Sequence, residues 1–313
     1  MKTVAVVLER PEQLVLSTLA LPEPADDEVV VDVEWSGIST GTEKLLWSGR
    51  MPAFPGMGYP LVPGYETVGR ITASGTGTSD RIGERVFVPG ARCFGDIRGL
   101  FGGAASRLVV AGARALPIDE EWGEKGVLLA LAATARHAVC LPGARMPELV
   151  VGHGVLGRLI ARVVVAMGAP APVVWETNAE RRAGALGYQV VDPATDDRRN
   201  YKSICDVSGD PAILDTLVSR LAPGGEVVLA GFYDQPLSFA FAPAFMREAS
   251  FRIAAQWQEA DLPAVRELAE SGALSLDGLI THRSDAMQAP DAYRTAFGDP
   301  ACLKMILDWR SCQ

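Results

Sequence analysis

The sequence predicts an α/β protein in which an all-β domain, a barrel or a sandwich, precedes a doubly wound parallel sheet. In roughly the first hundred residues, β-branched runs are interrupted by proline and glycine about every ten residues, which is typical of all-β domains. From residue 122, short apolar strands alternate with helices, and parallel strands need such crossover helices. The length of 313 residues suits two domains, at roughly 150 residues for each.

The first part of the chain contains five expected strands and one long loop. The strands are expected at residues 3–8, 14–19, 28–35, 67–75 and 85–89. The loop, residues 45–65, contains four prolines and four glycines, and its aromatic residues include Trp47, Phe54 and Tyr59. A loop of this length is usually functional or disordered, and its aromatic residues argue against disorder.

The second part of the chain alternates strands with helices. A helix is expected within residues 122–141, a strand at 149–151 and a helix from there to about Met167. Further strands are expected at 172–176, 188–192, 204–209 and 226–232, and further helices at 178–187, 212–225 and 261–271. Strand-like residues 276–283 and 302–309 form a tail whose domain the pattern alone leaves open.

Composition excludes several classes of protein. A net charge of −9 argues against a nucleic-acid binder, which would show basic clusters. The five cysteines are scattered without CxxC spacing, as in a reduced cytosolic protein that has neither a disulfide framework nor a thiolate metal cage. We expect a soluble protein without a signal peptide, because Glu9 and Arg10 end the short apolar run at the N-terminus.

A glycine motif marks the expected nucleotide site. Gly152, Gly154 and Gly157 have the GxGxxG spacing, follow an apolar strand and open a helix, and Glu176 ends the next strand. Gly152 would permit a tight turn, Gly154 would let a pyrophosphate approach, and Gly157 would let helix and strand pack closely. The alternative is a plain strand–helix turn in another kind of α/β protein. We expect His153, between two of the glycines, to be a turn residue at the solvent edge.

The same motif predicts the coenzyme. The free N–H groups near Val155 and Leu156 would bind the phosphates at the helix N-terminus. Glu176 would accept hydrogen bonds from the adenosine ribose and repel a 2′-phosphate, which favours NAD over NADP. Arg181 and Arg182 blunt this inference, because an arginine nearby can hold that phosphate.

Four stretches carry a family resemblance. They are "PGYETVGRI" (63–71), "FGGAASRLVV" (101–110), "ATARHAV" (133–139) and "LAPGGEVVLAGF" (221–232). Together they resemble the medium-chain dehydrogenase/reductase superfamily over nearly the whole chain. The resemblance implies a GroES-like β-barrel catalytic domain at 1–121 and 275–313, and a Rossmann domain at 122–274. It also implies a coenzyme contact at Thr134 and leaves a homodimer open.

The resemblance also predicts whether this chain binds the zinc ion found in many members of the superfamily. Zinc members of the superfamily have a ligating cysteine where Ser39 stands and a ligating histidine where Tyr65 stands, and only Glu66 of that set is kept here. A hydroxyl and a phenol are poor zinc ligands beside a thiolate and an imidazole. We therefore predict a zinc-free member with no metal.

Residues 37–71 resemble one branch of the superfamily more closely. That branch oxidises the 3-(1-hydroxyethyl) side chain of a bacteriochlorophyllide to 3-acetyl during bacteriochlorophyll a biosynthesis, with NAD as hydride acceptor. The alternatives are a generic zinc-free alcohol dehydrogenase or quinone reductase with a smaller substrate, and a nucleotide-sensing binding protein. The branch implies a cytoplasmic enzyme, and it leaves open a peripheral association with the photosynthetic membrane.

The resemblance assigns residues to the chemistry. Without zinc, a general base or a proton relay must take the alcohol proton. The catalytic candidates are Ser39, Lys44, Tyr65 and Glu66. Lys44 would lower the pKa of Tyr65, whereas Glu66 would alternatively hold a backbone group or an arginine in place. It is equally open that Tyr65 and Ser39 only fill the space of the lost metal site.

The expected substrate is a flat tetrapyrrole with a carboxylate. The substrate-binding candidates are Thr40, Trp47, Arg50, Phe54 and Tyr59. The aromatic residues would cover the ring system, and Arg50 would pair with the propionate. The alternative is that the loop packs on its own domain.

Overall fold

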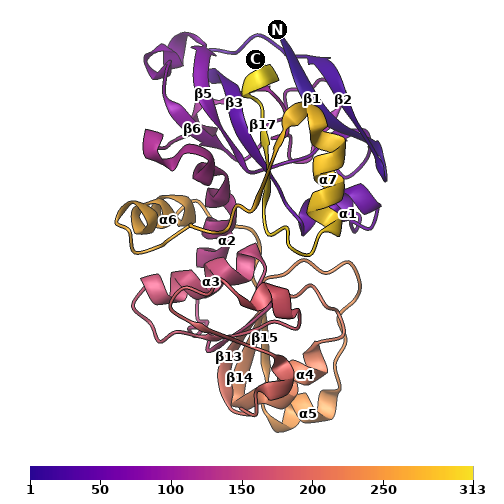
Figure 1. Cartoon of the computed structure of the whole chain (residues 1–313), viewed down its shortest axis with the longest axis vertical. Helices are drawn as coiled ribbons and strands as arrows, with labels where there is room; N and C mark the ends of the chain where they lie inside the picture. Colours follow the sequence, from indigo (N-terminus) through magenta and orange to yellow (C-terminus); the bar gives the residue numbers. More distant parts are fainter. Residues whose placement is uncertain (313) are drawn as a thin grey trace. The chain divides into compact units, whose positions relative to one another are not determined.

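The structure is a computed structural model, and it describes residues 1–312. The chain divides into two compact units, shown within Figure 1. The first unit combines Met1–Ala130 with the chain from Leu279 onward, and the second unit is Leu131–Gly278. No helix among the described residues is both long enough and apolar enough to span a bilayer.

Antiparallel strands dominate the first unit. Its strands are β1 (Lys2–Arg10), β2 (Gln13–Ala20), β3 (Glu28–Ile38), β4 (Leu61–Val62), β5 (Thr67–Ser74), β6 (Arg85–Val88), β7 (Arg98–Gly99), β8 (Arg107–Ala111), β9 (Leu116–Pro117), β16 (His282–Asp285) and β17 (Met305–Asp308). One sheet has the order β2-β1-β4-β7, and the other has the order β16-β17-β3-β5-β6-β9, with β8 also paired to β3. All five strands expected in this part of the chain are confirmed.

The long strand β3 organises the larger sheet. Its first half pairs with β8 and its last residues pair with β17, while β5 runs along its other side. Val29, Val30, Val31 and Val33 are all buried, so both faces of β3 are covered. The C-terminal strand β17 therefore lies beside the last residues of β3, which Ser39 follows directly.

Two helices belong to this unit, and sequence reasoning missed both. They are α1 (Thr42–Ser48) and α7 (Ala289–Gly298). The expected loop at 45–65 is therefore shorter, because Leu45 and Leu46 are buried on α1. The helix ends at Gly49, whose φ of 72° lies in the left-handed region that favours glycine after a helix.

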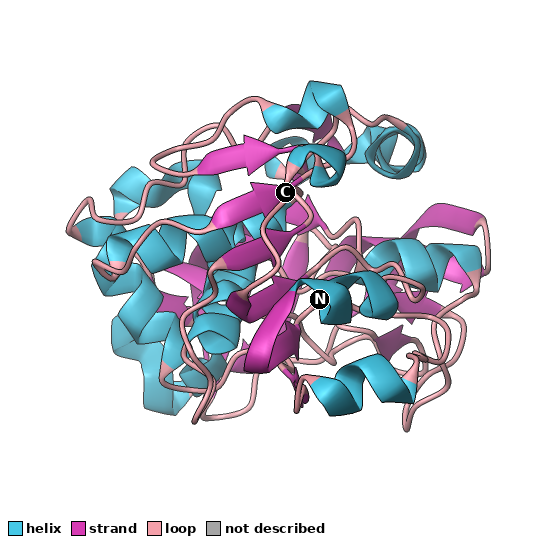
Figure 2. Ribbon diagram, turned by 90° about the horizontal axis from the view of Figure 1, so that it is seen from below, coloured by secondary structure: helices cyan, strands magenta, loops and turns pink. Residues whose placement is uncertain are grey.

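The second unit is built on a parallel sheet, with its helices and strands distinguished in Figure 2. The strands are β10 (Leu149–Val151), β11 (Val173–Trp175), β12 (Gln189–Val191), β13 (Tyr201–Asp206), β14 (Leu221–Leu229) and β15 (Ser250–Ile253). Their order is β12-β11-β10-β13-β14-β15, with every neighbouring pair parallel. This is the 3-2-1-4-5-6 order of a dinucleotide-binding sheet. All its strands are parallel, and the order in which they are added along the chain changes direction between β10 and β13. The predicted Rossmann sheet is confirmed.

The remaining elements are short. The helices are α2 (Leu129–Val139), α3 (Val155–Ala166), α4 (Leu214–Arg220), α5 (Phe241–Met246) and α6 (Asp261–Glu270). The 3₁₀ segments are Thr76–Arg81, Gly112–Arg114, Glu120–Leu128, Ala179–Arg182, Pro193–Thr195, Ala286–Gln288 and Arg310–Cys312. The helix expected at 212–225 stops at Arg220, and the strand expected at 276–283 begins only at His282.

One expected helix is absent from the described chain. The sequence predicts a helix at 178–187, but only Ala179–Arg182 forms a 3₁₀ turn. The guanidinium of Arg158 donates to the carbonyl oxygens of Arg181, Ala183 and Gly184, which a continuing helix would need for its own amides. The prediction is wrong because a side chain on α3 takes the acceptors of this segment.

Candidate active site

A glycine turn joins β10 to α3 in the second unit. Gly152 has a φ of 103°, which a residue with a side chain rarely adopts. A Cβ atom on Gly157 would lie 1.8 Å from the carbonyl oxygen of Gly152, so close packing of α3 on the turn requires glycine there. A Cβ atom on Gly154 would meet nothing within 4 Å, so the backbone at the start of α3 is open to a ligand.

The first turn of α3 suits an anion. The N–H groups of Val155 and Leu156 belong to the first helical turn, where no intrahelical acceptor exists. Gly154 is the N-cap residue and has no side chain with which to cap them. The positive end of the helix dipole adds to this preference. The residues present therefore fit the pyrophosphate of a dinucleotide.

The acidic residue after β11 lies against this turn. The carboxylate of Glu176 accepts hydrogen bonds from the backbone N–H groups of His153, at 3.2 Å, and Asn178, at 2.8 Å. The structure thus brings Glu176 and the glycine turn together, with Arg181 on the segment that follows. Thr134 lies half-buried on α2.

His153 is not at the solvent edge, so that prediction is wrong. Its side chain is fully buried, with Nδ1 at 2.6 Å from the carbonyl oxygen of Arg181 and Nε2 at 2.9 Å from the hydroxyl of Tyr188. Burial lowers the pKa of the imidazole to about 4, which leaves it neutral. No pattern in the sequence points to these partners, because Arg181 lies on a predicted helix and Tyr188 at the start of a predicted strand.

A set of polar side chains gathers in the first unit at the C-terminal end of β3. This polar cluster consists of Ser39, Glu43, Tyr65, Glu66, Tyr293 and Lys304. The Ser39 hydroxyl and the Tyr65 phenol share a hydrogen bond of 2.8 Å, and Thr42 also bonds the phenol. The structure therefore brings together two of the candidate catalytic residues.

Glu66 is held by a lysine that sequence reasoning missed. The buried ammonium of Lys304 lies 2.9 and 2.6 Å from the two carboxylate oxygens of Glu66 and donates to the carbonyl oxygen of Ile38 at 3.1 Å. A Cβ atom on Gly37 would lie 2.1 Å from the same carboxylate, so a glycine makes room for it. Burial raises the pKa of Glu66, and the Lys304 ammonium opposes that rise. The predicted arginine partner is a lysine instead.

Glu43 is a second buried carboxyl group of the cluster. It accepts a hydrogen bond from the backbone N–H of Ser39 at 3.0 Å and another from the Tyr293 hydroxyl at 2.7 Å. Burial raises the pKa of Glu43 to about 7, although both hydrogen bonds act in the opposite direction. Tyr293 lies on α7, a helix that the sequence did not predict, so nothing in the pattern pointed to this contact.

The amine of Lys44, which the resemblance assigns to Tyr65, contacts the end of α7. Its amine donates to the carbonyl oxygen of Phe297 at 2.9 Å, near the end of α7. Removal from water, followed by the charge of Glu66, raises the pKa of the Tyr65 phenol. The cluster therefore favours a protonated Tyr65, and assistance by Lys44 stays a prediction.

The donors at the zinc positions of the superfamily do not suit that metal. Ser39 and Tyr65 supply a hydroxyl and a phenol that bond each other. The carboxylate of Glu66 already has an ammonium partner on both oxygens. No group of three or more His, Cys, Asp and Glu side chains able to hold a metal occurs in residues 1–312. This donor set does not fit zinc, whose usual ligands are thiolate, imidazole and carboxylate.

The substrate-binding candidates lie around α1 and the loop after it. Trp47 and Tyr59 pack against a small core formed by residues such as Leu46, and the Tyr59 hydroxyl donates to the carbonyl oxygen of Leu46. Phe54 and Arg50 are exposed, and Thr40 is half-buried just before α1. The loop thus has both a packed part and an exposed part.

The fold and the two sites define a class of protein, namely an alcohol dehydrogenase with a GroES-like domain and a dinucleotide-binding sheet. Residues 25–120 match the family model described as the alcohol dehydrogenase GroES-like domain. A solved alcohol dehydrogenase from Escherichia coli CFT073, with NADH bound, superposes with a TM-score of 0.84 over 98% of this chain and 99% of that one, at 24% identity. At this identity the match supports the fold.

Two curated relatives are much more similar in sequence. Both are named 2-desacetyl-2-hydroxyethyl bacteriochlorophyllide A dehydrogenase. The protein from Cereibacter sphaeroides is 59% identical over 99% of both chains, and that from Rhodobacter capsulatus is 57% identical over 100% of both. The chain belongs to the medium-chain dehydrogenase/reductase superfamily and, with these relatives, to one family of dehydrogenases that act on a CH–OH group.

Proposed function

We propose that the chain oxidises the 3-(1-hydroxyethyl) group of a bacteriochlorophyllide to 3-acetyl, with NAD as the hydride acceptor and without a metal. The observation that carries this proposal is the identity of 59% and 57%, over essentially the whole chain, to the two dehydrogenases named for that substrate. A smaller alcohol as substrate has no comparable support.

The choice of NAD rests on the second unit. The open backbone at Gly154 and the start of α3 suit a pyrophosphate, and the Glu176 carboxylate beside the turn suits two ribose hydroxyls. A 2′-phosphate would bring a second negative charge to that carboxylate. When bound, the nicotinamide ring accepts the hydride that leaves the carbinol carbon.

Removal of the alcohol proton is assigned to residues of the first unit. As the hydride leaves the carbinol carbon, the alcohol O–H proton must leave its oxygen to form the carbonyl group. A pair of hydrogen-bonded hydroxyls can accept a proton at one oxygen while releasing one from the other, so neither has to ionise first. The Ser39–Tyr65 pair, with its 2.8 Å hydrogen bond and a Tyr65 pKa raised by burial, suits such a relay to solvent. Glu66, fixed by Lys304, would supply fixed negative charge beside the relay.

The substrate would lie against the exposed part of the loop after α1. Phe54 is 38% exposed and offers a ring face to an apolar macrocycle. Arg50 would pair with the propionate as a guanidinium–carboxylate contact. Trp47, Tyr59 and Thr40 would then border the macrocycle.

The test is absorbance at the NADH band on mixing the purified chain with 3-hydroxyethyl bacteriochlorophyllide and NAD. We expect NADH to form equally with and without a chelator, and more slowly with NADP. Loss of turnover on chelation, with recovery on adding zinc, would contradict the metal-free mechanism. Turnover of simple secondary alcohols but not of the pigment would contradict the substrate.

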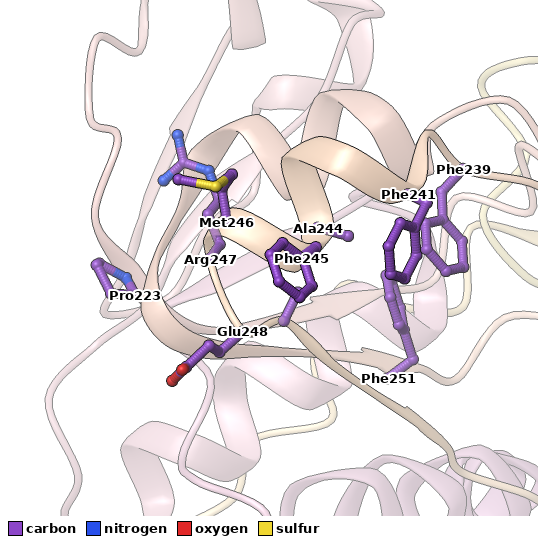
Figure 3. A pocket seen from close by; sticks show the side chains of 10 residues that line it. Pro223, Phe239, Phe241, Ala244, Phe245, Met246, Arg247, Glu248 and Phe251 are labelled. Atoms are coloured by element: carbon purple, nitrogen blue, oxygen red, sulfur yellow. The ribbon is translucent and has the colours of Figure 1, made fainter.

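We also propose a homodimer formed through the free edge of β15. Among the described strands β15 pairs only with β14, and unpaired edges invite pairing with another chain. Beside it lies a hollow of about 740 Å³, with the rings of Phe239, Phe241 and Phe251 at one end and Met246 at the other (Figure 3). An exposed apolar surface of this kind usually marks an interaction site. Sedimentation of the wild-type chain and of Ile253→Lys would test the dimer.

The proposed setting is the cytoplasm, with peripheral association at the photosynthetic membrane where the pigment is made. A flotation assay with vesicles of photosynthetic-membrane lipids, with and without bound pigment, would test this association.

A further inference from the structure

His153 is joined to its surroundings through all four of its polar groups. Its backbone N–H donates to the carboxylate of Glu176 at 3.2 Å, and its carbonyl oxygen accepts from Nε of Arg158 at 3.0 Å. Its ring nitrogens contact the carbonyl oxygen of Arg181 and the hydroxyl of Tyr188. One residue of the glycine turn therefore connects the turn to the whole segment that follows β11.

The hydrogen-bond partners decide which ring nitrogen carries the proton. A carbonyl oxygen can only accept, so Nδ1 is the N–H that donates to Arg181. In the neutral ring Nε2 is then an acceptor, and Tyr188 donates to it. A cationic imidazole would lack this acceptor and would face the buried guanidinium of Arg158. The site is thus built around a single neutral tautomer.

Two buried arginines on α3 complete the arrangement. Arg158 holds the carbonyl oxygens of Arg181, Ala183 and Gly184, as described above. One turn later, Arg162 donates to the carbonyl oxygens of Ser275 and Asp277 and bonds the Tyr188 hydroxyl. The segment that carries Arg181 is therefore held on the glycine turn and on α3.

This arrangement also constrains Arg181 and Arg182, the two arginines that follow Glu176 closely in the sequence. Arg182 donates to the carbonyl oxygens of Glu176 and Thr177 and to the carboxylate of Asp192, so its guanidinium is committed. The backbone of Arg181 is fixed by His153 and Arg158. A 2′-phosphate would need an arginine free to turn towards it and a carboxylate free to turn away.

We infer that His153 is a positioning residue for the coenzyme: its backbone N–H holds Glu176 and its side chain holds the segment 178–184 in an arrangement that favours a 2′-hydroxyl over a 2′-phosphate. This inference rests on the proposed use of NAD and adds the residue that enforces it. The imidazole acts through the backbone of Arg181 and through Tyr188, whereas the contact with Glu176 is made by the backbone N–H. It does not itself take part in hydride transfer.

The test is the ratio of dissociation constants for NADPH and NADH, measured by fluorescence with the full chain. A residue that only stabilises the fold would weaken both coenzymes together and leave this ratio unchanged. We expect His153→Ala to lower the ratio by up to about tenfold, because the side-chain hydrogen bonds to the carbonyl oxygen of Arg181 and the hydroxyl of Tyr188 are lost while the backbone bond to Glu176 remains. His153→Asn keeps an N–H near the place of Nδ1 and should retain most of the preference.

Two further variants keep the inference falsifiable if His153→Ala folds poorly. Tyr188→Phe keeps the ring and should lower the ratio less than His153→Ala. In a Glu176→Ala background, His153→Ala should still lower the ratio, because the side chain acts through the backbone of Arg181 and through Tyr188 and not through that carboxylate. An unchanged ratio in folded His153→Ala and Tyr188→Phe would overturn the inference alone. Wild type that binds neither coenzyme, or prefers NADPH, would overturn the proposed function as well.

Discussion

The glycine turn of the second unit and the polar cluster of the first unit are assembled in opposite ways. The turn, its helix and Glu176 come from one continuous stretch of chain, residues 149–176. The cluster joins residues that are far apart in the sequence: Glu66 and Lys304 are separated by 238 positions, and Glu43 and Tyr293 by 250. A contiguous site depends on local backbone geometry, whereas the cluster depends on β17 and α7 returning to β3. We therefore expect the glycine turn to be sensitive to side-chain atoms added next to its backbone. The polar cluster should be sensitive to the loss of a buried charge.

The largest expected effect is the loss of the lysine. Lys304→Met leaves the Glu66 carboxylate buried without its cation, and removing one partner of a buried ion pair costs about 3–5 kcal/mol. Urea unfolding, with hydrogen exchange of the β3 and β17 amides, measures the cost. The double variant Glu66→Gln/Lys304→Met should recover more than half of the loss. Equal instability of the single and double variants would contradict an ion pair at this position.

The same contrast explains what sequence could predict. The strands of the first unit, the parallel sheet and the glycine turn follow from local patterns of apolar and turn residues. Lys304 could not be predicted as the partner of Glu66, because no spacing in the sequence relates them. The burial of His153 could not be predicted for a similar reason. It depends on a hydrogen bond to Tyr188 and on Arg158, which holds a segment with helical propensity of its own in a non-helical form.

The next effect concerns the relay and not stability. Tyr65→Phe removes the phenol that bonds Ser39, and turnover should fall about 10²- to 10⁴-fold, the usual range for proton-transfer groups. NADH binding, measured by fluorescence, should stay at the wild-type level because the second unit is unchanged. Ser39→Ala is the matched variant and should lower turnover in the same way. Near-normal turnover of Tyr65→Phe would mean that the phenol only fills space.

A smaller effect follows from the second carboxyl group of the cluster. Because the pKa of Glu43 rises from about 4.5 when unfolded to about 7 when folded, the folded state binds its proton more tightly. Its contribution to stability is therefore full below pH 4.5 and is lost as the pH rises through 7, by up to about 3 kcal/mol. Glu43→Gln should remove this slope and gain relative stability with rising pH. A difference between wild type and variant that is constant from pH 5 to 8 would contradict the shift.

The smallest effect separates two glycines of one motif. Gly157→Ala places a methyl group 1.8 Å from the Gly152 carbonyl oxygen, so α3 must shift, at a cost of about 1–3 kcal/mol typical of overpacking. Gly154→Ala meets nothing within 4 Å and should leave the unfolding midpoint unchanged. The same methyl group occupies the space proposed for the pyrophosphate, so Gly154→Ala should weaken NADH binding without weakening the fold. If both variants lose stability equally, the open space beside Gly154 is needed by the protein itself; if neither loses NADH binding, the coenzyme does not approach the turn from that side.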